Sequence, residues 1–367
     1  MLPILVYSLF GTCLFIQSVF WFWIVRRKAL TPCDPLETDI KRLPPISVII
    51  CGRNESKFIQ NNLNQFLQQD YSLYEIIYVD DDSSDDSLEQ LGQIQNTRLV
   101  VCEHKKENPG KRDALKEGMR KAHYHYWVLT DADCSPKSNQ WLKHYGEAFS
   151  KGASIVLGVS PIEKTKGFLN TFIRAENVLE IATYVSLSRL GFPYMGVGRN
   201  MGYTKEIGQK SKSLHSAPLL SGDDDLVVNE LANKSNTFVI DHPDSYIFSP
   251  AKKSIAQYIH QKQRHLSAGK HYKRKDKLLI GTLALSHTLS NPILIIPFLL
   301  TGAYPLAILW IIRTLLFISL FTRLSHRYNM DLKPYQVLLF DLGLIGYYGL
   351  FTNYIFWKNE KKWDPSS

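Results

Sequence analysis

The stretch Glu75-Ile-Ile-Tyr-Val-Asp-Asp-Asp-Ser83 decides the fold, because a short apolar run ends there in a cluster of acidic residues. A second stretch, Trp127-Val-Leu-Thr-Asp-Ala-Asp133, has the same form. Apolar runs of this length predict strands that are covered on both faces, as in a parallel sheet. The carboxyl ends of parallel strands meet at one edge of the sheet, where ligands bind. We therefore expect the two acidic clusters to lie close together.

The surrounding sequence alternates between predicted strands and predicted helices. Strands are expected at residues 46–51, 99–101 and 155–157, and helices at 55–67, 111–122, 138–149 and 168–190. This alternation is typical of an α/β domain with a doubly wound sheet. Neither a GxGxxG motif nor a Walker A motif follows the first strand, which argues against dinucleotide or ATP binding of the usual kinds.

The acidic clusters point to a bound cation. Carboxylates crowded at strand ends repel one another unless something cationic or a hydrogen-bond donor lies between them. Mg²⁺ or Mn²⁺ prefers hard oxygen ligands, and the phosphates of a substrate complete its shell. Aspartates also cap helices and stabilise turns, which accounts for Asp85 but poorly for two clusters at two strand ends. The sequence therefore predicts a divalent cation together with a diphosphate-bearing ligand.

Both ends of the chain are strongly apolar. The run from Leu2 to Val25 is long enough to cross a bilayer as a helix, and Arg26, Arg27 and Lys28 follow it at once. A signal peptide carries its charges before the apolar stretch, so this segment is expected to be an anchor. The positive-inside rule then places the N-terminus outside the cell membrane and the next domain in the cytoplasm.

The C-terminal region is expected to hold two to three spans. Residues 278–321 predict a hairpin of two, and residues 335–357 a third. Four full crossings would leave the basic tail outside, against the charge rule, so either the last segment is re-entrant or interfacial, or an earlier one does not fully cross. Arg313 and Asp341 lie within these runs. One interpretation is that they face the protein interior, where they have a function or pair with each other. The other is that Arg313 snorkels to the interface and Asp341 is hydrated near a helix end.

Charge and cysteines limit the other possibilities. The 367-residue chain has a formal net charge of +9, which suggests an anionic partner. Nucleic acid is disfavoured as that partner, because the basic residues cluster beside the apolar runs and lack interleaved stacking aromatics. The five cysteines show no CxxC pairing, so we expect free thiols in a reducing compartment.

Four further segments keep a characteristic order along the chain: Ile46-Ser-Val-Ile-Ile-Cys51, Gln69-Asp-Tyr71, Gly110-Lys-Arg-Asp-Ala-Leu115 and Asp131-Ala-Asp133. With the acidic stretch at 75–83, they resemble the family 2 glycosyltransferases, and the apolar ends resemble the membrane-bound branch that includes cellulose and hyaluronan synthases. The resemblance covers about residues 44–272. It implies an α/β domain with the GT-A (Rossmann-like) nucleotide-sugar-binding fold, an N-terminal transmembrane anchor and C-terminal transmembrane helices.

The resemblance also implies roles in donor binding. Asp81 is expected to accept from the uracil of a UDP donor, with Glu55 nearby. Asp131 is expected to lie against the nucleotide, and Asp133 to bind the metal ion. Lys111 is expected to offset phosphate charge, although a lysine in a first helical turn is often only solvated.

The same resemblance suggests a catalytic base in Ser221-Gly-Asp-Asp-Asp-Leu226. Aligning Leu226 with the family's leucine makes Asp223 the base, and a shift of one residue makes it Asp224. The base would remove the proton of the acceptor hydroxyl, and a single displacement would invert the anomeric carbon. Acidic residues at a helix N-terminus are also favourable without any catalytic role.

Gln261-Lys-Gln-Arg-His265 resembles the Gln-x-x-Arg-Trp motif of the membrane synthases, with His265 where tryptophan would stand. Gln261 and Arg264 retain donors for a diphosphate. The missing indole removes a stacking surface for a sugar ring, which argues against long-polymer synthesis. Segment 196–203 resembles the family's glycine-rich segment that precedes the base.

The sequence thus predicts three regions: an anchor at residues 1–28, a cytoplasmic catalytic domain at 44–273 and a membrane region at 277–357. The expected function is metal-dependent, inverting transfer of a hexose-type sugar from a nucleotide sugar, with UDP favoured, to a lipid-linked or glycan acceptor. A processive polysaccharide synthase and a catalytically inactive nucleotide-sugar-binding membrane protein are the alternatives.

Overall fold

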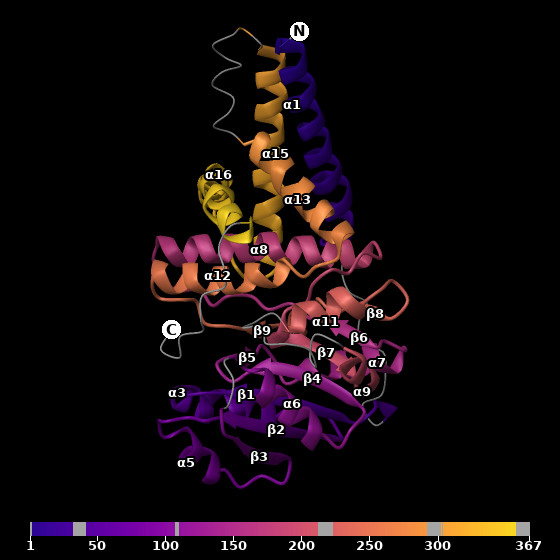
Figure 1. Cartoon of the computed structure of the whole chain (residues 1–367), viewed down its shortest axis with the longest axis vertical. Helices are drawn as coiled ribbons and strands as arrows, with labels where there is room; N and C mark the ends of the chain where they lie inside the picture. Colours follow the sequence, from indigo (N-terminus) through magenta and orange to yellow (C-terminus); the bar gives the residue numbers. More distant parts are fainter. Residues whose placement is uncertain are drawn as a thin grey trace.

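A seven-stranded mixed sheet forms the part of the computed structural model that lies farthest from the N-terminus (Figure 1). The structure describes residues 2–31, 42–106, 110–211, 223–291, 302 and 304–356. The strands, in chain order, are β1 (Ile46–Gly52), β2 (Tyr74–Asp81), β3 (Leu99–His104), β4 (Tyr126–Asp131), β6 (Ile155–Leu157), β7 (Met201–Thr204) and β8 (Thr237–Val239). Their spatial order is β3-β2-β1-β4-β7-β6-β8, and a two-stranded sheet pairs β5 (Ser135–Pro136) with β9 (Ile247–Phe248).

The register of the parallel strands brings the acidic clusters together. Strands β1, β2, β3 and β4 are mutually parallel where they pair, and Cys51 of β1 lies level with both Val79 and Asp131. Alternate residues of β1 enter two separate cores, with Val48 on one face and Ile49 on the other. Both faces are therefore covered, which explains the continuous apolar run and confirms the predicted parallel strands.

Short helices cover the faces of this sheet. They are α3 (Ser56–Phe58), α4 (Asn64–Leu67), α5 (Ser87–Gly92), α6 (Arg112–Lys121), α7 (Trp141–Ser150), α9 (Lys205–Lys210) and α11 (Asp223–Leu231). The helix predicted over residues 55–67 is formed in three pieces, because a π-helical segment, η3 (Ile59–Leu63), separates α3 from α4.

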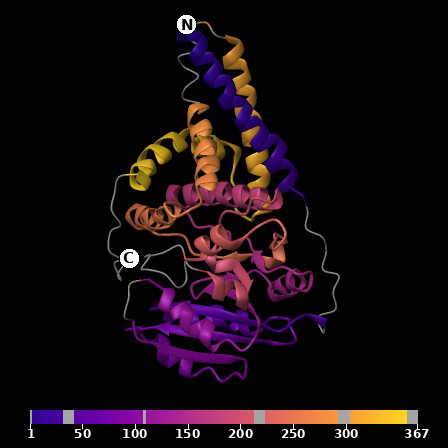
Figure 2. The same cartoon turned by 45° about the vertical axis from the view of Figure 1, so that its right-hand side comes forward.

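A second layer lies between the sheet and the apolar helices. The helices α8 (Phe168–Arg189) and α12 (Ile255–Gly269) run crosswise beneath α1 (Leu2–Ser18) and α15 (Tyr304–Arg327) in both Figure 1 and Figure 2. The π-helical segment η1 (Val19–Val25) and α2 (Arg26–Lys28) continue α1 toward this layer. The remaining long helices are α13 (Arg274–Leu289) and α16 (Pro334–Phe356).

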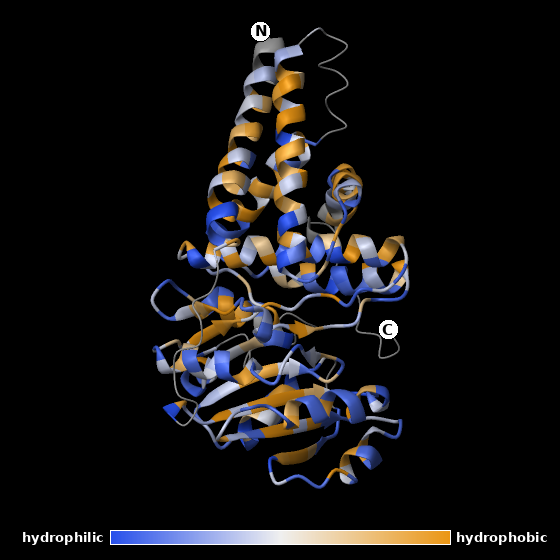
Figure 3. Ribbon diagram, turned by 180° about the vertical axis from the view of Figure 1, so that it is seen from behind, coloured by the Kyte–Doolittle hydropathy of each residue, from blue (hydrophilic) through white to orange (hydrophobic). Residues whose placement is uncertain are grey.

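Among the described residues, two helices are long and apolar enough to cross a membrane, Tyr7–Lys28 and Tyr304–Arg327. The second has 24 residues and is therefore about 36 Å long, compared with about 30 Å for the hydrocarbon core of a bilayer. Figure 3 shows apolar residues along this pair as well as inside the sheet. Large apolar side chains on the pair are exposed, among them Leu9, Phe15, Trp23, Ile308, Leu309, Ile311, Ile312, Leu315 and Leu316.

A buried carboxylate ties the sheet domain to the helices. Asp241 accepts from Arg189 Nη2 of α8 at 2.7 Å and from Arg327 Nη2 at the end of α15 at 3.0 Å. Arg189 also donates to the carbonyl of Lys28, and Arg327 to the carbonyl of Thr31. Because Asp241 is fully buried and doubly paired, this contact fixes the ends of three helices beside the strand β8.

Charged residues also pair inside the helical bundle. Arg313 Nη1 lies 2.5 Å from Asp341 Oδ2, and His287 Nε2 lies 2.8 Å from Asp341 Oδ1. The carbonyl oxygen of Asp341 accepts from Asn291 Nδ2 at 2.6 Å. Arg313 and Asp341 are both buried, so the structure confirms their mutual pairing and contradicts the snorkelling alternative.

Replacing Asp341 with leucine is expected to leave the Arg313 guanidinium buried without a carboxylate. Breaking a buried pair on one side costs about 3–5 kcal/mol of unfolding free energy, whereas replacing both partners by apolar residues is often nearly neutral. We expect a large fall in the thermal unfolding temperature in detergent for Asp341→Leu and a partial recovery for Arg313→Leu/Asp341→Leu. An unfolding temperature equal to wild type for the single variant would contradict this account.

One buried amide holds three parts of the sheet domain together. Asn200 Oδ1 accepts from Trp141 Nε1 at 2.9 Å and from the Tyr145 hydroxyl at 2.8 Å. Its Nδ2 donates to the carbonyl of Val159 at 2.7 Å and to that of Ser245 at 3.0 Å. Asn200 is fully buried, so the amide satisfies polar groups that have no access to water.

The variant Asn200→Leu is expected to lower the free energy of unfolding by about 3 kcal/mol or more, because buried donors and acceptors lose their partner. Thermal unfolding of the purified protein measures the effect. Asn64→Ala, at an exposed helical asparagine, is the matched control and should stay close to wild type. Similar unfolding temperatures for the two variants would refute this role of Asn200.

Candidate active site

A cavity of about 850 Å³ lies between the carboxyl edge of the sheet and the α8–α12 layer. It is lined by every predicted site residue whose side chain the structure describes: Glu55, Asp81, Lys111, Asp131, Asp133, Gln261 and Arg264. The two candidate bases, Asp223 and Asp224, begin α11, but their side chains lie outside the described part of the chain. Their neighbour Asp225 does line the cavity.

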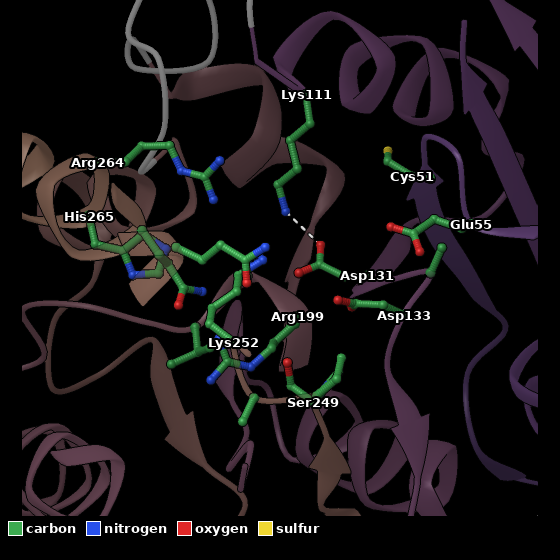
Figure 4. Close-up of a pocket in the computed structure, with 18 of the residues that line it drawn as sticks. Cys51, Glu55, Lys111, Asp131, Asp133, Arg199, Ser249, Lys252, Arg264 and His265 are labelled. Carbon is green, nitrogen blue, oxygen red and sulfur yellow. Dashed lines mark hydrogen bonds and ion pairs between the residues drawn. The ribbon is translucent and has the colours of Figure 1, made fainter. Parts of the chain in front are cut away.

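The end of β4 supplies the acidic wall of the cavity. Asp131 is the last residue of the strand, and ligand atoms of Asp131, Asp133 and Cys134 all lie within 4.8 Å of one another. Lys111 Nζ, at the start of α6, lies 2.8 Å from Asp131 Oδ1. The Cys134 thiol donates to Asp133 Oδ1 at 3.3 Å. Figure 4 shows Glu55, Asp131 and Asp133 converging on the same space.

The crowding of carboxylates changes their protonation. Burial, together with the charges of Asp133 and Asp131, raises the pKa of Glu55 to about 8. Burial and the charge of Asp131 raise the pKa of Asp133 as well. Burial also tends to raise the pKa of Asp131, but the neighbouring Lys111 ammonium outweighs it and holds the pKa below its usual value. Negative charge is therefore present in excess at this wall.

A glycine allows β1 to approach this wall closely. A Cβ atom at Gly52 would lie 2.2 Å from the Tyr78 hydroxyl and 2.8 Å from the Cβ of Ala132. Since these distances are below van der Waals contact, only glycine fits between β2 and the loop that carries Asp133. The tight packing holds the Glu55 turn beside the end of β4.

Cationic side chains form the opposite wall. Arg199, Lys252 and Arg264 line the cavity, and Arg264 extends into it from the side opposite the carboxylates in Figure 4. Arg199 Nε is held by a 2.6 Å hydrogen bond to Ser160 Oγ. Burial, and then the charge of Lys262, keep the pKa of His265 well below its usual range, so this ring is neutral. The two walls together can hold a polyanion and a cation side by side.

The two acidic residues that end β2 have different contacts. Asp81 lines the cavity, and its carboxylate contacts His104 Nδ1 at 3.1 Å and Lys106 Nζ. Asp80 instead accepts from the amide and the hydroxyl of Ser83, at 3.0 and 2.6 Å. The Asp80 side chain therefore stabilises the turn that follows β2, whereas Asp81 faces the cavity.

Three residues of the site were missed by the sequence reasoning. Arg199 falls in the glycine-rich segment, but nothing in that segment marks the arginine as part of a binding wall. Lys252 belongs to no motif, and it reaches the cavity only because the chain after β9 passes this edge of the sheet. Cys134 directly follows the Asp131-Ala-Asp133 motif, so proximity in sequence was the available signal.

The residues of the acidic wall fit a divalent metal ion. Asp131 and Asp133 offer oxygen ligands, and the raised pKa values of Glu55 and Asp133 show that a positive charge would be favourable there. The nearby cationic side chains could hold phosphate groups, and the phosphate oxygens could then be the remaining ligands of the metal ion.

Known proteins share both sequence and fold with this chain. Residues 47–207 match the sequence model described as "Glycosyl transferase family 2". Over 130 residues the chain is 28% identical to poly-beta-1,6-N-acetyl-D-glucosamine synthase of Staphylococcus aureus (strain COL) and 27% identical to that of Staphylococcus epidermidis. Each match covers 35% of this chain and only 32% of the relative.

A solved structure resembles nearly the whole chain. The mannosyltransferase PcManGT from Pyrobaculum calidifontis, in complex with GDP-Man and Mn²⁺, aligns with a TM-score of 0.59 and 18% sequence identity. The match covers 96% of this chain and 99% of that one, and shows a shared fold. The sequence match identifies residues 47–207 as a family 2 glycosyltransferase domain, and the strand order agrees with the GT-A fold.

Proposed function

We propose that this chain is a membrane-anchored, inverting glycosyltransferase that moves a sugar from a nucleoside diphosphate donor to an acceptor held at the membrane. The observation that carries the proposal is the single cavity in which Asp131 and Asp133 face Arg199, Lys252 and Arg264. A diphosphate needs cationic partners on one side, and a cation bound to it needs carboxylates on the other.

The donor would lie along the carboxyl edge of the sheet. Asp81 and Glu55 flank the part of the cavity near β1 and β2, which suits the nucleoside, with UDP favoured. Lys111 and Arg264 would neutralise the diphosphate, with Gln261 as a further hydrogen-bond donor. Asp133, with Asp131, would hold Mg²⁺ or Mn²⁺, which stabilises the charge that develops on the leaving diphosphate.

The chemical step needs a base on the acceptor side of the cavity. Asp223, or Asp224 one residue along, would remove the proton of the acceptor hydroxyl as its oxygen forms a bond to the anomeric carbon. The bond between that carbon and the diphosphate oxygen breaks, and its electron pair stays with the diphosphate. A single displacement of this kind inverts the anomeric configuration. The described side chain of Asp225 lines the cavity from the same helix and supports the placement.

The arrangement of the helices supports a membrane location. Residues 1–28 and 277–357 would lie in or on the bilayer, and residues 44–273 would form the cytoplasmic catalytic domain. Exposed apolar side chains cover α1 and α15, while Arg26, Arg27 and Lys28 lie at the end nearest the sheet domain. Basic residues at that end favour the cytoplasmic side by the positive-inside rule.

A processive polysaccharide synthase is the second candidate. The similarity to poly-beta-1,6-N-acetyl-D-glucosamine synthases favours it. His265 at the position of the motif's tryptophan favours transfer of one or a few sugars, because it removes a stacking surface. The size of the product separates the two, since a synthase would yield long polymers.

Donor hydrolysis by the detergent-purified full chain tests the proposal. A panel of nucleotide sugars is incubated with Mg²⁺, with Mn²⁺ or with EDTA, and release of the nucleoside diphosphate is measured. We expect cation-dependent release from one donor, with a loss of about 100-fold or more in Asp133→Asn and in Asp223→Asn. Asp86→Asn, at an exposed aspartate that does not line the cavity, is the matched control.

An enzyme that needs its acceptor before it turns over would release no nucleoside diphosphate in this assay. Donor binding is therefore measured in parallel by calorimetry. Cation-dependent binding without release or transfer would favour the inactive nucleotide-sugar-binding alternative. If no nucleotide sugar binds in the presence of either cation, the proposed function is wrong.

The raised pKa of Glu55 gives a separate prediction for the metal-free protein. Its folded state holds a proton that the unfolded state has already released, so the free energy of unfolding falls as the pH rises from the ordinary carboxyl range toward about 8. Thermal unfolding between about pH 6 and about pH 8.5 should show a steeper loss for wild type than for Glu55→Gln. Added Mn²⁺ should reduce the difference between the two proteins. If wild type and Glu55→Gln lose stability equally with pH in the absence of Mn²⁺, the proposed crowding of carboxylates around Glu55 is wrong.

A further inference from the structure

The cavity extends beyond the strand ends to the helix layer that covers them. Helix α8 presents Ile173, Glu176, Asn177 and Glu180 to it, at a spacing that places them on one face of the helix. We call these four residues the α8 wall. None of them belongs to a motif that the sequence reasoning singled out.

One cation beside the α8 wall, Lys262, already has a partner. Lys262 Nζ lies 2.5 Å from Glu176 Oε1, and this oxygen also accepts from the Tyr347 hydroxyl at 3.2 Å. Lys262 and Glu176 are both buried, so each neutralises the other. Glu180 has no ion pair with any residue in the described ranges, and it adds a negative charge to this end of the cavity.

The α8 wall also holds an unsatisfied acceptor. Asn177 is 3% exposed, and its Oδ1 has no hydrogen-bond partner among the described residues. Leaving a buried amide oxygen unpaired costs about 1–3 kcal/mol, so the position favours a ligand that brings a donor. Asn177 lines the cavity, so a rotation of its side-chain amide would bring Oδ1 to a hydroxyl group bound there, and the hydroxyl would supply that donor.

The charges of the cavity thus differ between its two ends. Beside Asp131, the cations Lys111 and Arg264 can receive phosphate groups, whereas the α8 wall offers carboxylate and amide oxygens. Oxygen acceptors bind hydroxyl groups well and repel a second phosphate. The end of the cavity near α8 is therefore suited to an uncharged polyol.

We infer that the α8 wall is an acceptor subsite, in which Asn177 and Glu180 bind the hydroxyl-bearing, uncharged end of a glycan. This inference rests on the proposed glycosyl transfer and narrows its acceptor class: the attacking oxygen is a sugar hydroxyl, and an acceptor whose reacting group is a phosphate is rejected. The hydroxyl loses its proton to the base as it forms the new glycosidic bond.

Acceptor competition with the donor found by the hydrolysis panel tests the inference. The detergent-purified full chain receives radiolabelled donor and either uncharged oligosaccharides, including β-1,6-linked N-acetylglucosamine oligomers, or a polyprenyl phosphate. We expect label to enter the oligosaccharides. The acceptor KM should rise about tenfold in Asn177→Ala and in Glu180→Gln, which corresponds to about 1.4 kcal/mol of lost binding. Glu180→Asp should recover part of the affinity.

The control is Thr183→Ala, which lies on the same helix and does not line the cavity, and it should match wild type. Donor Kd, measured without acceptor, reports separately on the donor end of the cavity. Equal or better transfer to the polyprenyl phosphate overturns the inference, as does donor turnover with no uncharged glycan accepted or an acceptor KM unchanged in both variants. Failure to bind any donor overturns the proposed function itself.

Discussion

Electrostatic repulsion among three carboxylates is the constraint around which the catalytic part of this molecule is organised. Glu55, Asp131 and Asp133 meet because the parallel register of β1 and β4 brings their carboxyl ends level. Lys111 relieves part of that repulsion, and the raised pKa values of the other two carboxyls show that relief is incomplete. The strand register that holds the sheet together therefore also creates the crowded carboxylates that favour a cation.

The sequence was informative wherever one local rule was sufficient. Continuous apolar runs predicted the parallel strands, and acidic residues directly after two of them predicted where the carboxylates meet, since strand ends share one edge of a sheet. The pairing of Arg313 with Asp341 was one of the alternatives that the sequence left open, and the structure decides for it.

What the sequence did not reveal depends on contacts between distant segments. Asn200 looks like an ordinary loop residue until α7 and the strand connections surround it. Arg199 and Lys252 reach the cavity from separate segments, and the contact of His287 with Asp341 requires α13 to pack against α16. Local sequence patterns do not predict such contacts between distant segments, so the tertiary structure is needed to find them.

The position of the helix layer has a consequence for how substrates meet. The cavity lies directly below α8 and α12, and the exposed apolar helices rise from the other side of that layer. With those helices in a bilayer, as proposed, a lipid-carried acceptor and the catalytic domain would be confined to one thin layer of solution at the membrane. Their encounter becomes a two-dimensional search at high effective concentration, in which even weak acceptor binding gives useful occupancy. The proposed nucleotide-sugar donor, by contrast, would diffuse in from the bulk solution and depend on the charges at the strand ends.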